Sequence, residues 1–388
     1  MTMVSKDPAG TALLQTASRP FDDAIAMPPE VYTSEAFLAR EVETIFAREW
    51  ICVGRASALG AVGDYLTCEV AGQPIIVLRD RDGGVRAMSN VCLHRMSTLL
   101  EGTGNVRAIV CPYHAWSYNL DGTMRGAPLM NGRPGFCKDE YRLPDIRCEE
   151  WLGWLYVTLD ANAAPVADRL RPLEQMVAPY GMERYVECFR ETHVWDTNWK
   201  ILAENFMESY HLPVCHARTV GPHSKLEEME CPPGLAAFNY HWITKEASLP
   251  IGNAHPTNTR LTGHWRRTTG LITIYPSHLI TLTPGYFWYL SLHPQGVGRV
   301  RMIFGGGLSP EFIDDPKGQE YVAALKALLD AVNIEDRRCT EKVFHGMGAA
   351  RAAPGRLSHL ERPLYDFTRY LAGRTAGFDP ASAPAGGA

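Results

Sequence analysis

Two pairs of cysteine and histidine residues constrain this chain more than any other feature of its sequence. His94 follows Cys92 by two residues, His114 follows Cys111 by three, and sixteen residues separate the two pairs. Each spacing suits a tight loop that presents one thiolate and one imidazole to the same centre. Two thiolates and two imidazoles bind a [2Fe–2S] cluster in which histidines replace thiolates on one iron. The pairs lie in a block, residues 50–160, of short strand-like runs broken by turns.

A structural zinc site is the competing interpretation of this motif, because zinc also binds two cysteines and two histidines. Zinc fingers keep the cysteines in one half of the motif and the histidines in the other, whereas each half here mixes the two. The sequence therefore favours the cluster. We expect the nearby Tyr113, Trp116 and Tyr118 to pack around its loops.

A second set of candidate metal ligands lies about a hundred residues further on. Glu208 and His211 are three residues apart and share one face of a predicted helix, with Asn205 on the same stripe. Pro213 interrupts this helix and allows His216 to fold back toward His211. Two histidines and one carboxylate form the facial triad of non-haem Fe(II) oxygenases, with positions left open for oxygen.

The spacing alone does not choose the carboxylate of this triad. Glu335 and Asp336 lie in a helix-like segment downstream, where the sequence alone favours a solvated helix face for Asp336. If His211 and His216 bind iron, the chain combines an electron relay with an iron that activates oxygen, which implies reductive activation of dioxygen. The alternatives are two structural histidines, or an electron carrier that uses the first motif alone and leaves the C-terminal half unexplained.

Composition excludes several other classes of protein. The net charge of −5 argues against a general affinity for nucleic acid or anionic membrane. The ten cysteines have no spacing typical of a disulfide framework, so the eight outside the cluster motif are expected to be buried thiols. The sequence shows no signal peptide and no apolar run long enough for a transmembrane helix. A cytoplasmic location is therefore expected.

Both motifs and their surroundings resemble those of the α (oxygenase) subunits of the Rieske non-haem iron ring-hydroxylating family, across residues 28–372. The most similar segments are residues 90–95 and 111–118 at the cluster, 198–200 and 204–206 before the iron ligands, and 333–346 near the C-terminus. The resemblance implies that Asp336 is the third iron ligand. It also implies that Glu208 bridges His114 of one subunit and His211 of its neighbour.

The family also implies a fold class and a domain order. The expected fold is α+β: an all-β Rieske [2Fe–2S] domain at residues 48–160 inserted into a larger catalytic domain for the mononuclear iron. That catalytic domain takes residues 31–47 and 161–374 and has a curved antiparallel sheet flanked by helices. A homotrimer is expected. Composition predicts a flexible N-terminal arm at residues 1–30 and a disordered tail at residues 375–388.

One departure from the family pattern narrows the expected reaction. The bridging acid is Glu208 where most aromatic-ring dioxygenases have Asp, and the segment between Asn205 and this acid is one residue shorter. This variant resembles the branch that acts on quaternary ammonium and N-methyl compounds. The resemblance implies a monooxygenase that takes electrons from a separate NAD(P)H-dependent reductase, with or without a ferredoxin. The alternative is a (di)oxygenase that hydroxylates aromatic rings.

The substrate pocket is expected in the strand-rich region 235–292. On a strand, Tyr286 and Trp288 face one way, and Phe287 and Tyr289 face the other. One pair is a candidate lining for the pocket, where aromatic faces hold a cationic nitrogen or an aromatic ring; the alternative places both pairs in the core. Arg266 and Arg267 either bind a substrate carboxylate or lie on the surface. Residues 305–307 are three consecutive glycines, which are expected in a turn or bulge.

Overall fold

The computed structural model describes residues 7–245 and 250–379. The chain divides into two compact units, of which the smaller spans Phe46–Arg169. The larger unit joins the residues up to Ile45 with those from Leu170 onward. In chain order the smaller unit is therefore an insertion in the larger one. The inserted unit is built mainly of β-sheets, whereas the larger unit combines a sheet with long helices. This arrangement confirms the predicted α+β class.

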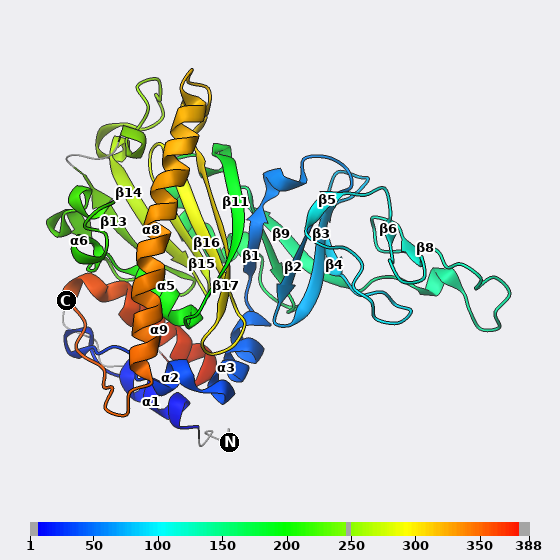
Figure 1. Ribbon diagram of the computed structural model, residues 1–388, viewed down its shortest axis with the longest axis horizontal. Helices are drawn as coiled ribbons and strands as arrows, with labels where there is room; N and C mark the ends of the chain where they lie inside the picture. Colours follow the sequence, from blue (N-terminus) through cyan, green and yellow to red (C-terminus); the bar gives the residue numbers. More distant parts are fainter. Residues whose placement is uncertain (1–6, 246–249, 380–388) are drawn as a thin grey trace. The chain divides into compact units, whose positions relative to one another are not determined.

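Two antiparallel sheets make up the inserted unit (Figure 1). Seven strands form the first in the order β1-β10-β9-β4-β3-β2-β5, and β6, β7 and β8 form the second. A buried cluster joins Ile76 of the first sheet to Ile109 of the second and includes Cys92 and Cys111. The strands are β1 Ile51–Arg55, β2 Asp64–Val70, β3 Gln73–Arg79, β4 Val85–Ser89, β5 Thr103–Asn105, β6 Ile109–Val110, β7 Ser117–Tyr118, β8 Met124–Gly126, β9 Asp145–Trp151 and β10 Trp154–Thr158.

A tight hairpin lies at residues 151–157, where the nearly unbroken apolar run predicts one continuous strand. Strand β9 ends at Trp151, and β10 begins at Trp154 and pairs with it. Leu152 and Gly153 between them have φ angles of 46° and 78°, the left-handed values that a two-residue hairpin turn requires. The prediction of a single strand is therefore wrong, because the turn is hidden inside an apolar run.

One seven-stranded antiparallel sheet forms the core of the larger unit, in the order β11-β17-β16-β15-β14-β13-β12. Apolar runs predict four strands in this part of the sequence, at residues 271–275, 279–282, 287–292 and 299–304, and all four appear here within a few residues of these positions. Their bounds are β11 Val186–Trp195, β12 Met229–Glu230, β13 Phe238–Thr244, β14 Thr268–Ile274, β15 His278–Leu282, β16 Tyr286–Pro294 and β17 Val300–Leu308.

The triple glycine lies inside β17, so the expected turn or bulge at these positions is wrong. A Cβ atom added at Gly305 would lie 2.4 Å from the ring of Tyr289, and one at Gly306 would lie 2.6 Å from the ring of Phe189. Aromatic rings of the neighbouring strands occupy the space that side chains would need. The irregularity itself is on the partner strand, because β11 shifts register between Glu187 and Phe189.

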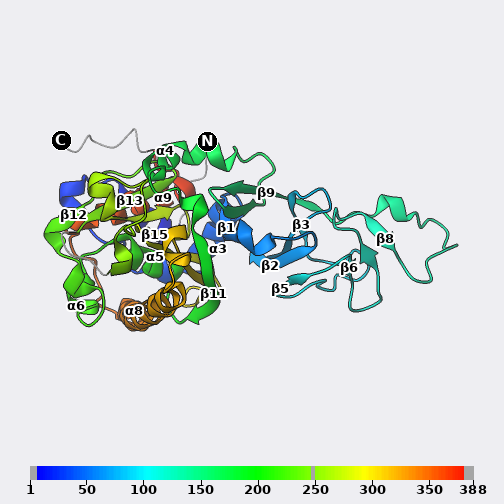
Figure 2. The same ribbon diagram turned by 90° about the horizontal axis from the view of Figure 1, so that it is seen from above.

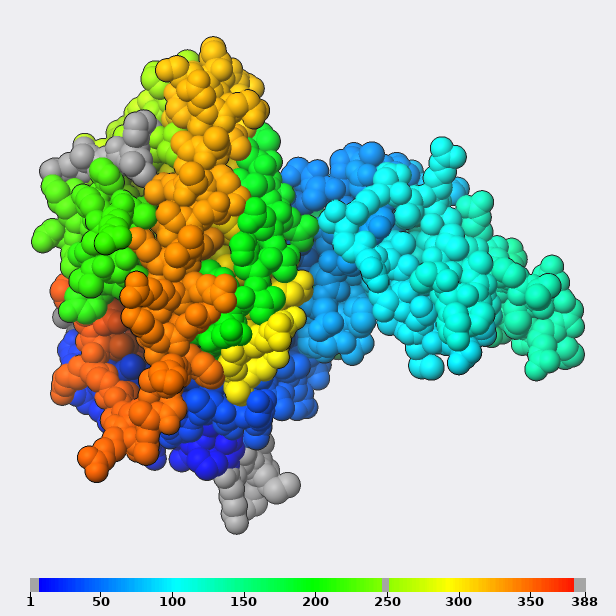
Figure 3. All heavy atoms as spheres, viewed as in Figure 1, coloured from blue at the N-terminus to red at the C-terminus, as the bar shows by residue number. Residues whose placement is uncertain are grey.

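Helices cover this sheet, and the longest of them, α8, crosses one face with α5 beside it (Figures 1 and 2). In the space-filling view α8 forms a continuous ridge on this face (Figure 3). Ser34 caps α3 as predicted, because its hydroxyl accepts a hydrogen bond from the backbone N–H of Phe37 at 3.1 Å. The helices are α1 Pro8–Ala17, α2 Glu30–Thr33, α3 Glu35–Glu41, α4 Val166–Val177, α5 Trp199–Met207, α6 Leu212–Cys215, α7 Pro310–Ile313, α8 Gly318–Met347 and α9 Arg362–Thr375.

The predicted N-terminal arm is wrong for residues 8–17, which form helix α1. Asp7 caps this helix, and Ala9, Leu13 and Ala17 are buried along the face that packs on α9. Small residues dominate the helix, which is why its apolar face was hard to see in the sequence. At the other end α9 runs to Thr375 and Phe378 is buried, while the rest of the predicted tail, residues 380–388, lies outside the described residues.

Of the eight cysteines outside the cluster motif, Cys52 and Cys68 are the buried thiols that the sequence predicted, and the others differ from that expectation. Cys215 and Cys339 form a disulfide between α6 and α8, and Cys137 is exposed. Cys339 lies three residues after Asp336 on α8, so the same helix face that carries Asp336 brings it to α6. None of the described helices is both long and apolar enough to cross a bilayer. The cytoplasmic location stays a prediction.

Candidate iron and cluster sites

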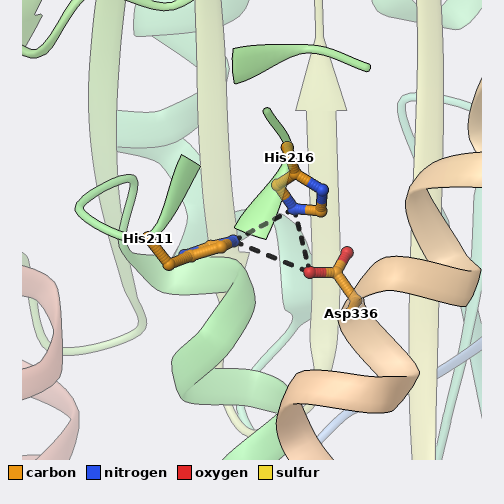
Figure 4. Close-up of side chains that lie close together, drawn as sticks. All are labelled: His211, His216 and Asp336. Atoms are coloured by element: carbon orange, nitrogen blue, oxygen red, sulfur yellow. Dashed lines mark hydrogen bonds and ion pairs between the residues drawn. The ribbon is translucent and has the colours of Figure 1, made fainter. Parts of the chain in front are cut away.

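His211, His216 and Asp336 converge on one point in the larger unit (Figure 4). The two Nε2 atoms of the histidines lie 3.2 Å apart. Oδ1 of Asp336 lies 3.0 Å from Nε2 of His216 and 3.6 Å from Nε2 of His211. One ligand atom from each residue thus falls within 4.8 Å of the others, which is the arrangement that a single metal ion requires.

The segment that carries both histidines begins where α5 ends. The helix stops at Met207, one residue before the predicted ligand segment, and Glu208 is extended with φ −124° and ψ 155°. Glu208 and His211 therefore meet across a turn rather than on the face of one helix. Oε1 of Glu208 accepts a hydrogen bond from Nδ1 of His211 at 2.6 Å, and its Oε2 accepts one from the His211 backbone N–H at 3.1 Å.

Pro213 has a different role from the one that the sequence suggested. It stands in the first turn of α6, where a proline's missing N–H is not needed, so it begins this short helix instead of breaking a long one. Both histidines flank α6, with His211 at its start and His216 just after its end. The single turn of helix brings the two imidazoles to the same side.

Glu335 makes the matching contact on the second histidine. Its Oε2 lies 2.8 Å from Nδ1 of His216 and accepts a hydrogen bond from the Thr219 hydroxyl at 2.6 Å. The sequence left Glu335 and Asp336 open as a solvated helix face, and the structure turns both toward the histidines. With Nδ1 of each imidazole bonded to a carboxylate, both Nε2 atoms are left for a metal.

Two further polar groups fix the ligand segment. Ser209 Oγ lies 2.7 Å from Nε2 of His241 on β13, and both side chains are buried. Burial lowers the pKa of His241 to about 3, so this imidazole is neutral. Asn205 Nδ2 lies 3.4 Å from Nε2 of His211, on the predicted stripe of α5.

The chemistry of these donors fits a divalent cation. Burial alone would lower the pKa of His211, but the nearby carboxylates of Asp336 and Glu208 outweigh it and raise this pKa to about 10. Burial would raise the pKa of Asp336, yet the two histidines hold it below its usual value. Oδ1 of Asp336 is buried and accepts no well-aligned hydrogen bond from any residue that the structure describes. A site that favours positive charge and leaves a buried carboxylate oxygen facing two imidazoles suits iron(II).

Two similar loops present the cysteines and histidines of the first motif. The backbone N–H of Met96 donates to the carbonyl of Cys92, and that of Ala115 donates to the carbonyl of Cys111, both at 3.1 Å. Met96 and Ala115 share a φ angle of 57°, so each loop turns back in the same way. The repeated geometry brings the rings of His94 and His114 to a centroid distance of 4.7 Å.

The thiols of this motif are buried and the imidazoles are near the surface. Cys92 is 1% and Cys111 3% exposed, whereas His94 is exposed and His114 half-buried. Burial would raise the pKa of Cys111, but hydrogen bonds from the backbone N–H groups of Tyr113 and His114 lower it below its usual value. These contacts stabilise a thiolate, which is the form that binds iron.

The aromatic residues of the motif support the loops, as the sequence predicted. Trp116 stacks on His94 with centroids 4.6 Å apart, and the Tyr118 hydroxyl lies 3.4 Å from Sγ of Cys92. The four Cys and His ligands are not among the groups of three or more in the described ranges, 7–245 and 250–379, whose donor atoms meet around one ion.

A cavity opens beside His211, His216 and Asp336. Side chains of α5, α8 and one face of the sheet line it, among them Phe206, Ile243, Leu271 and Leu290. Of the predicted aromatic run, Tyr286 and Trp288 line the cavity, while Phe287 and Tyr289 are fully buried elsewhere. Arg266 hydrogen-bonds to backbone carbonyls, and Arg267 is exposed; neither is in the lining.

Comparison with protein families now decides the affiliation of the chain. Residues 182–377 match the ring hydroxylating alpha subunit (catalytic domain), and residues 49–142 match the Rieske [2Fe–2S] domain. The chain belongs to the Rieske ring-hydroxylating oxygenase family. As a Rieske oxygenase it holds a [2Fe–2S] cluster and a mononuclear iron.

Individual relatives of this Rieske oxygenase point to one branch. It is 35% identical over 198 residues to the carnitine monooxygenase oxygenase subunit of Acinetobacter baumannii, which covers 50% of this chain and 53% of that protein. It is 31% identical to the glycine betaine monooxygenase oxygenase subunit of Pseudomonas aeruginosa over 61% of this chain and 56% of that protein. The chain thus spans about half the length of these curated relatives.

A solved structure shows the same fold. The quaternary ammonium Rieske monooxygenase CntA, in complex with an inhibitor, has a TM-score of 0.82 and 23% identity, covering 93% of this chain and 98% of that one. At this identity the likeness establishes the architecture of the Rieske oxygenase and leaves its substrate to the pocket residues.

Sequence reasoning missed the contact of Glu335 with His216, the Ser209–His241 pair and the place of Lys245 in the cavity lining. Glu335 and the Ser209–His241 pair depend on contacts between distant elements, and no local spacing announces them. Lys245 also lines the cavity. It follows a strand, and nothing in the sequence distinguishes it from an exposed lysine. One available signal was the position of Glu335 directly before the proposed iron ligand Asp336.

Proposed function

We propose that this chain is the terminal oxygenase component of a multicomponent monooxygenase. It would use O2 and electrons from a separate NAD(P)H-dependent reductase to hydroxylate a C–H bond of a small substrate. The observation that carries the proposal is the convergence of His211, His216 and Asp336 at the wall of a cavity large enough to have its own lining of apolar and aromatic side chains.

The residue roles form part of the proposal. Cys92, Cys111, His94 and His114 hold the cluster, and His211, His216 and Asp336 hold the iron. When bound, the cluster supplies single electrons and the iron supplies the site of oxygen activation. Glu208 and Glu335 fix the tautomers of the two histidines through their Nδ1 atoms, at 2.6 Å and 2.8 Å. Asn205 belongs to the same site, because its Nδ2 lies 3.4 Å from Nε2 of His211, the atom that would bind the iron.

The assembly that we propose is a homotrimer in which Glu208 also accepts a hydrogen bond from His114 of a neighbouring subunit. A carboxylate has two oxygens and about four acceptor positions, so the bond to His211 leaves room for a second imidazole. The half-buried His114 has the accessibility that such a contact requires. The domain assignment, with a Rieske domain at 48–160 and a catalytic domain around it, follows the two compact units.

We propose N-methyl or quaternary-ammonium compounds as substrates. Phe206 and Trp288 meet edge to face at 5.2 Å in the cavity lining, and aromatic faces attract an alkylated ammonium group. Hydroxylation of an N-methyl carbon uses one oxygen atom, while two electrons and two protons reduce the other atom to water. The resulting hemiaminal loses formaldehyde, so the net reaction is N-demethylation. The relatives that act on carnitine and glycine betaine support this choice.

Ring hydroxylation is the second candidate, because the same aromatic side chains stack on an arene. The experiment that separates the two supplies the purified protein with a surrogate reductase, NADH and oxygen. Formaldehyde released in step with oxygen consumption supports N-demethylation. A hydroxylated ring product or a dihydrodiol from aromatic compounds would contradict it and favour the alternative.

A further inference from the structure

One feature of the cavity is not explained by iron or cluster chemistry: a lysine in its lining. Lys245 is the one basic side chain apart from the histidines among the described residues that line the cavity. The carboxylates there belong to Glu208 and Asp336, and both face His211. The remaining lining is apolar, aromatic or uncharged. A cation in such a lining needs a separate explanation.

Lys245 lines the cavity from the end of strand β13. It follows β13 directly, and its backbone N–H still pairs with the carbonyl of Arg267 at 3.3 Å. Ile243 and Lys245, two residues apart, therefore share the cavity face of the sheet. His241 is two residues earlier on the same strand and holds the ligand segment through Ser209. At about 3.3 Å per residue, Lys245 lies about 13 Å along the strand from His241.

Within residues 7–245 and 250–379, the ammonium group of Lys245 has no counter-charge at contact distance. No carboxylate among the residues that the structure describes forms an ion pair with it. Burial lowers the pKa of Lys245, and the charge of Glu228 offsets this only in part. Glu228 itself lies 3.9 Å from Lys225. A partly buried cation without a partner is costly, and an anion that enters the cavity would relieve that cost.

The other groups of the cavity lining suit the rest of such a molecule. The rings of Tyr286 and Trp288 line the cavity on the neighbouring part of the sheet. The hydroxyl of Thr281 is buried there and, within the described ranges, has no hydrogen-bond partner. One cavity lining thus combines metal ligands, apolar and aromatic surface, and a cation.

We infer that Lys245 binds the carboxylate of the substrate, so that the preferred substrates are organic acids with an apolar or N-methylated body between the acid and the reacting carbon. This inference rests on the proposed oxygenase function and narrows its substrate class. It assigns the carboxylate to Lys245, where the sequence had suggested Arg266 or Arg267. Neutral analogues and cations without an acid group should bind poorly.

Matched pairs of ligands test the inference by direct binding. Calorimetry on the purified holoprotein would compare trimethylammonioacetate, 4-(trimethylammonio)butanoate and 4-methoxybenzoate with the carboxamide of each. We expect at least one acid to bind at least tenfold more tightly than its amide. Lys245→Met should remove this difference while leaving amide binding unchanged, and Lys245→Arg should retain most of it. Lys225→Met, a change at an exposed lysine, should behave like the wild type.

The outcomes separate this inference from the proposed function. If every acid and its amide bind within twofold of each other, if no member of the panel binds, or if Lys245→Met keeps the preference, the anion site is refuted. Turnover is measured separately with the reductase. Equal kcat/KM for acid and amide would leave the oxygenase function intact and refute the anion site. Lysine-dependent binding of acids without any product would support the anion site and contradict the oxygenase.

Discussion

At the scale of single residues, the proposed iron site depends on which side chains face the two imidazoles. Metal chemistry limits the candidate types to a few, and their spacing along 208–216 is local, so the sequence could indicate His211 and His216. It could not choose between Glu335 and Asp336. The structure turns Asp336 to Nε2 of His216 and Glu335 to Nδ1 of the same ring, a distinction that only the geometry of α8 against α6 provides.

Asp336→Ala tests the third ligand. The variant should lose mononuclear iron, because two histidines alone leave the ion without an anionic ligand, while the visible spectrum of the cluster stays unchanged. Iron and labile sulfide per subunit are the measurements. Asp330→Ala on the same helix, whose carboxylate pairs with Lys326 at 2.5 Å, is the control and should keep its iron. Full iron content in Asp336→Ala would assign the ligand elsewhere.

Glu208→Gln tests the bridging role. The amide oxygen can still accept the hydrogen bond from His211, so both metals should remain bound. A neutral amide accepts less strongly and cannot bond two imidazole N–H groups as a carboxylate does, so turnover should fall at least about tenfold. The rate of cluster reoxidation in a single turnover is the decisive measurement. Near-normal reoxidation would remove Glu208 from the electron path.

Glu204 gives a pH-dependent prediction on the other side of α5. Burial raises its pKa to about 8, with the Tyr32 hydroxyl donating a hydrogen bond at 2.8 Å as a weaker opposing effect. Between the ordinary carboxyl pKa and this raised value, Glu204 keeps its proton in the folded state but loses it in the unfolded chain. This contribution to stability is present at low pH and is lost as the pH rises toward about 8.

Glu204→Gln should remove this dependence. Near pH 5 the variant and the wild type should have similar Tm values, and near pH 8.5 the variant should melt several degrees higher, because it carries no buried charge. Thermal unfolding at both pH values is the measurement, and Glu320→Gln on the exposed start of α8 is the control. A Tm difference that is the same at both pH values would contradict the assignment.

At the scale of helices and strands, long elements with strong periodicity were predictable and their ends were not. The apolar repeat of α8 gives its length to within two residues. Helix α5 ends at Met207, where the side chain of Glu208 turns back to His211. No Gly or Pro at this position marks the end of the helix in the sequence. The hairpin at Leu152 was hidden for a similar reason, since apolar residues continue through the turn.

Strand β17 supplies a prediction at this scale. Gly305→Ala places a methyl group where the ring of Tyr289 lies 2.4 Å away, so either the ring or the strand must move. We expect a loss of about 1–3 kcal/mol in the free energy of unfolding, as for other overpacked cores. Thermal or denaturant unfolding measures it. Gly346→Ala near the end of α8 meets no atom within 4 Å and should be neutral or mildly stabilising. Equal stabilities for the two variants would contradict the packing argument.

At the scale of the whole molecule, the proposed trimer predicts complementation between defective subunits. Cys92→Ser should lack the cluster and Asp336→Ala should lack the iron, so each is inactive alone. If electrons pass from the cluster of one subunit to the iron of its neighbour, co-expressed mixed trimers should recover part of the activity. The measurement is turnover per intact iron site in tagged, isolated hetero-oligomers. If confirmed mixed trimers recover no turnover, electrons pass from the cluster to the iron within one subunit.

The alternation of side chains in the large sheet has one further consequence. Phe287 and Tyr289 are buried away from the cavity, while Tyr286 and Trp288 between them line it. Neighbouring positions of one strand are therefore under different selection: the cavity-lining positions are selected for substrate binding and the buried ones for packing. Descendants of this chain can exchange Ile243, Leu271 or Trp288 and acquire new chemistry, while the intervening positions preserve a foldable scaffold. In related sequences, we therefore expect variable and invariant positions to alternate along strands β13 to β16.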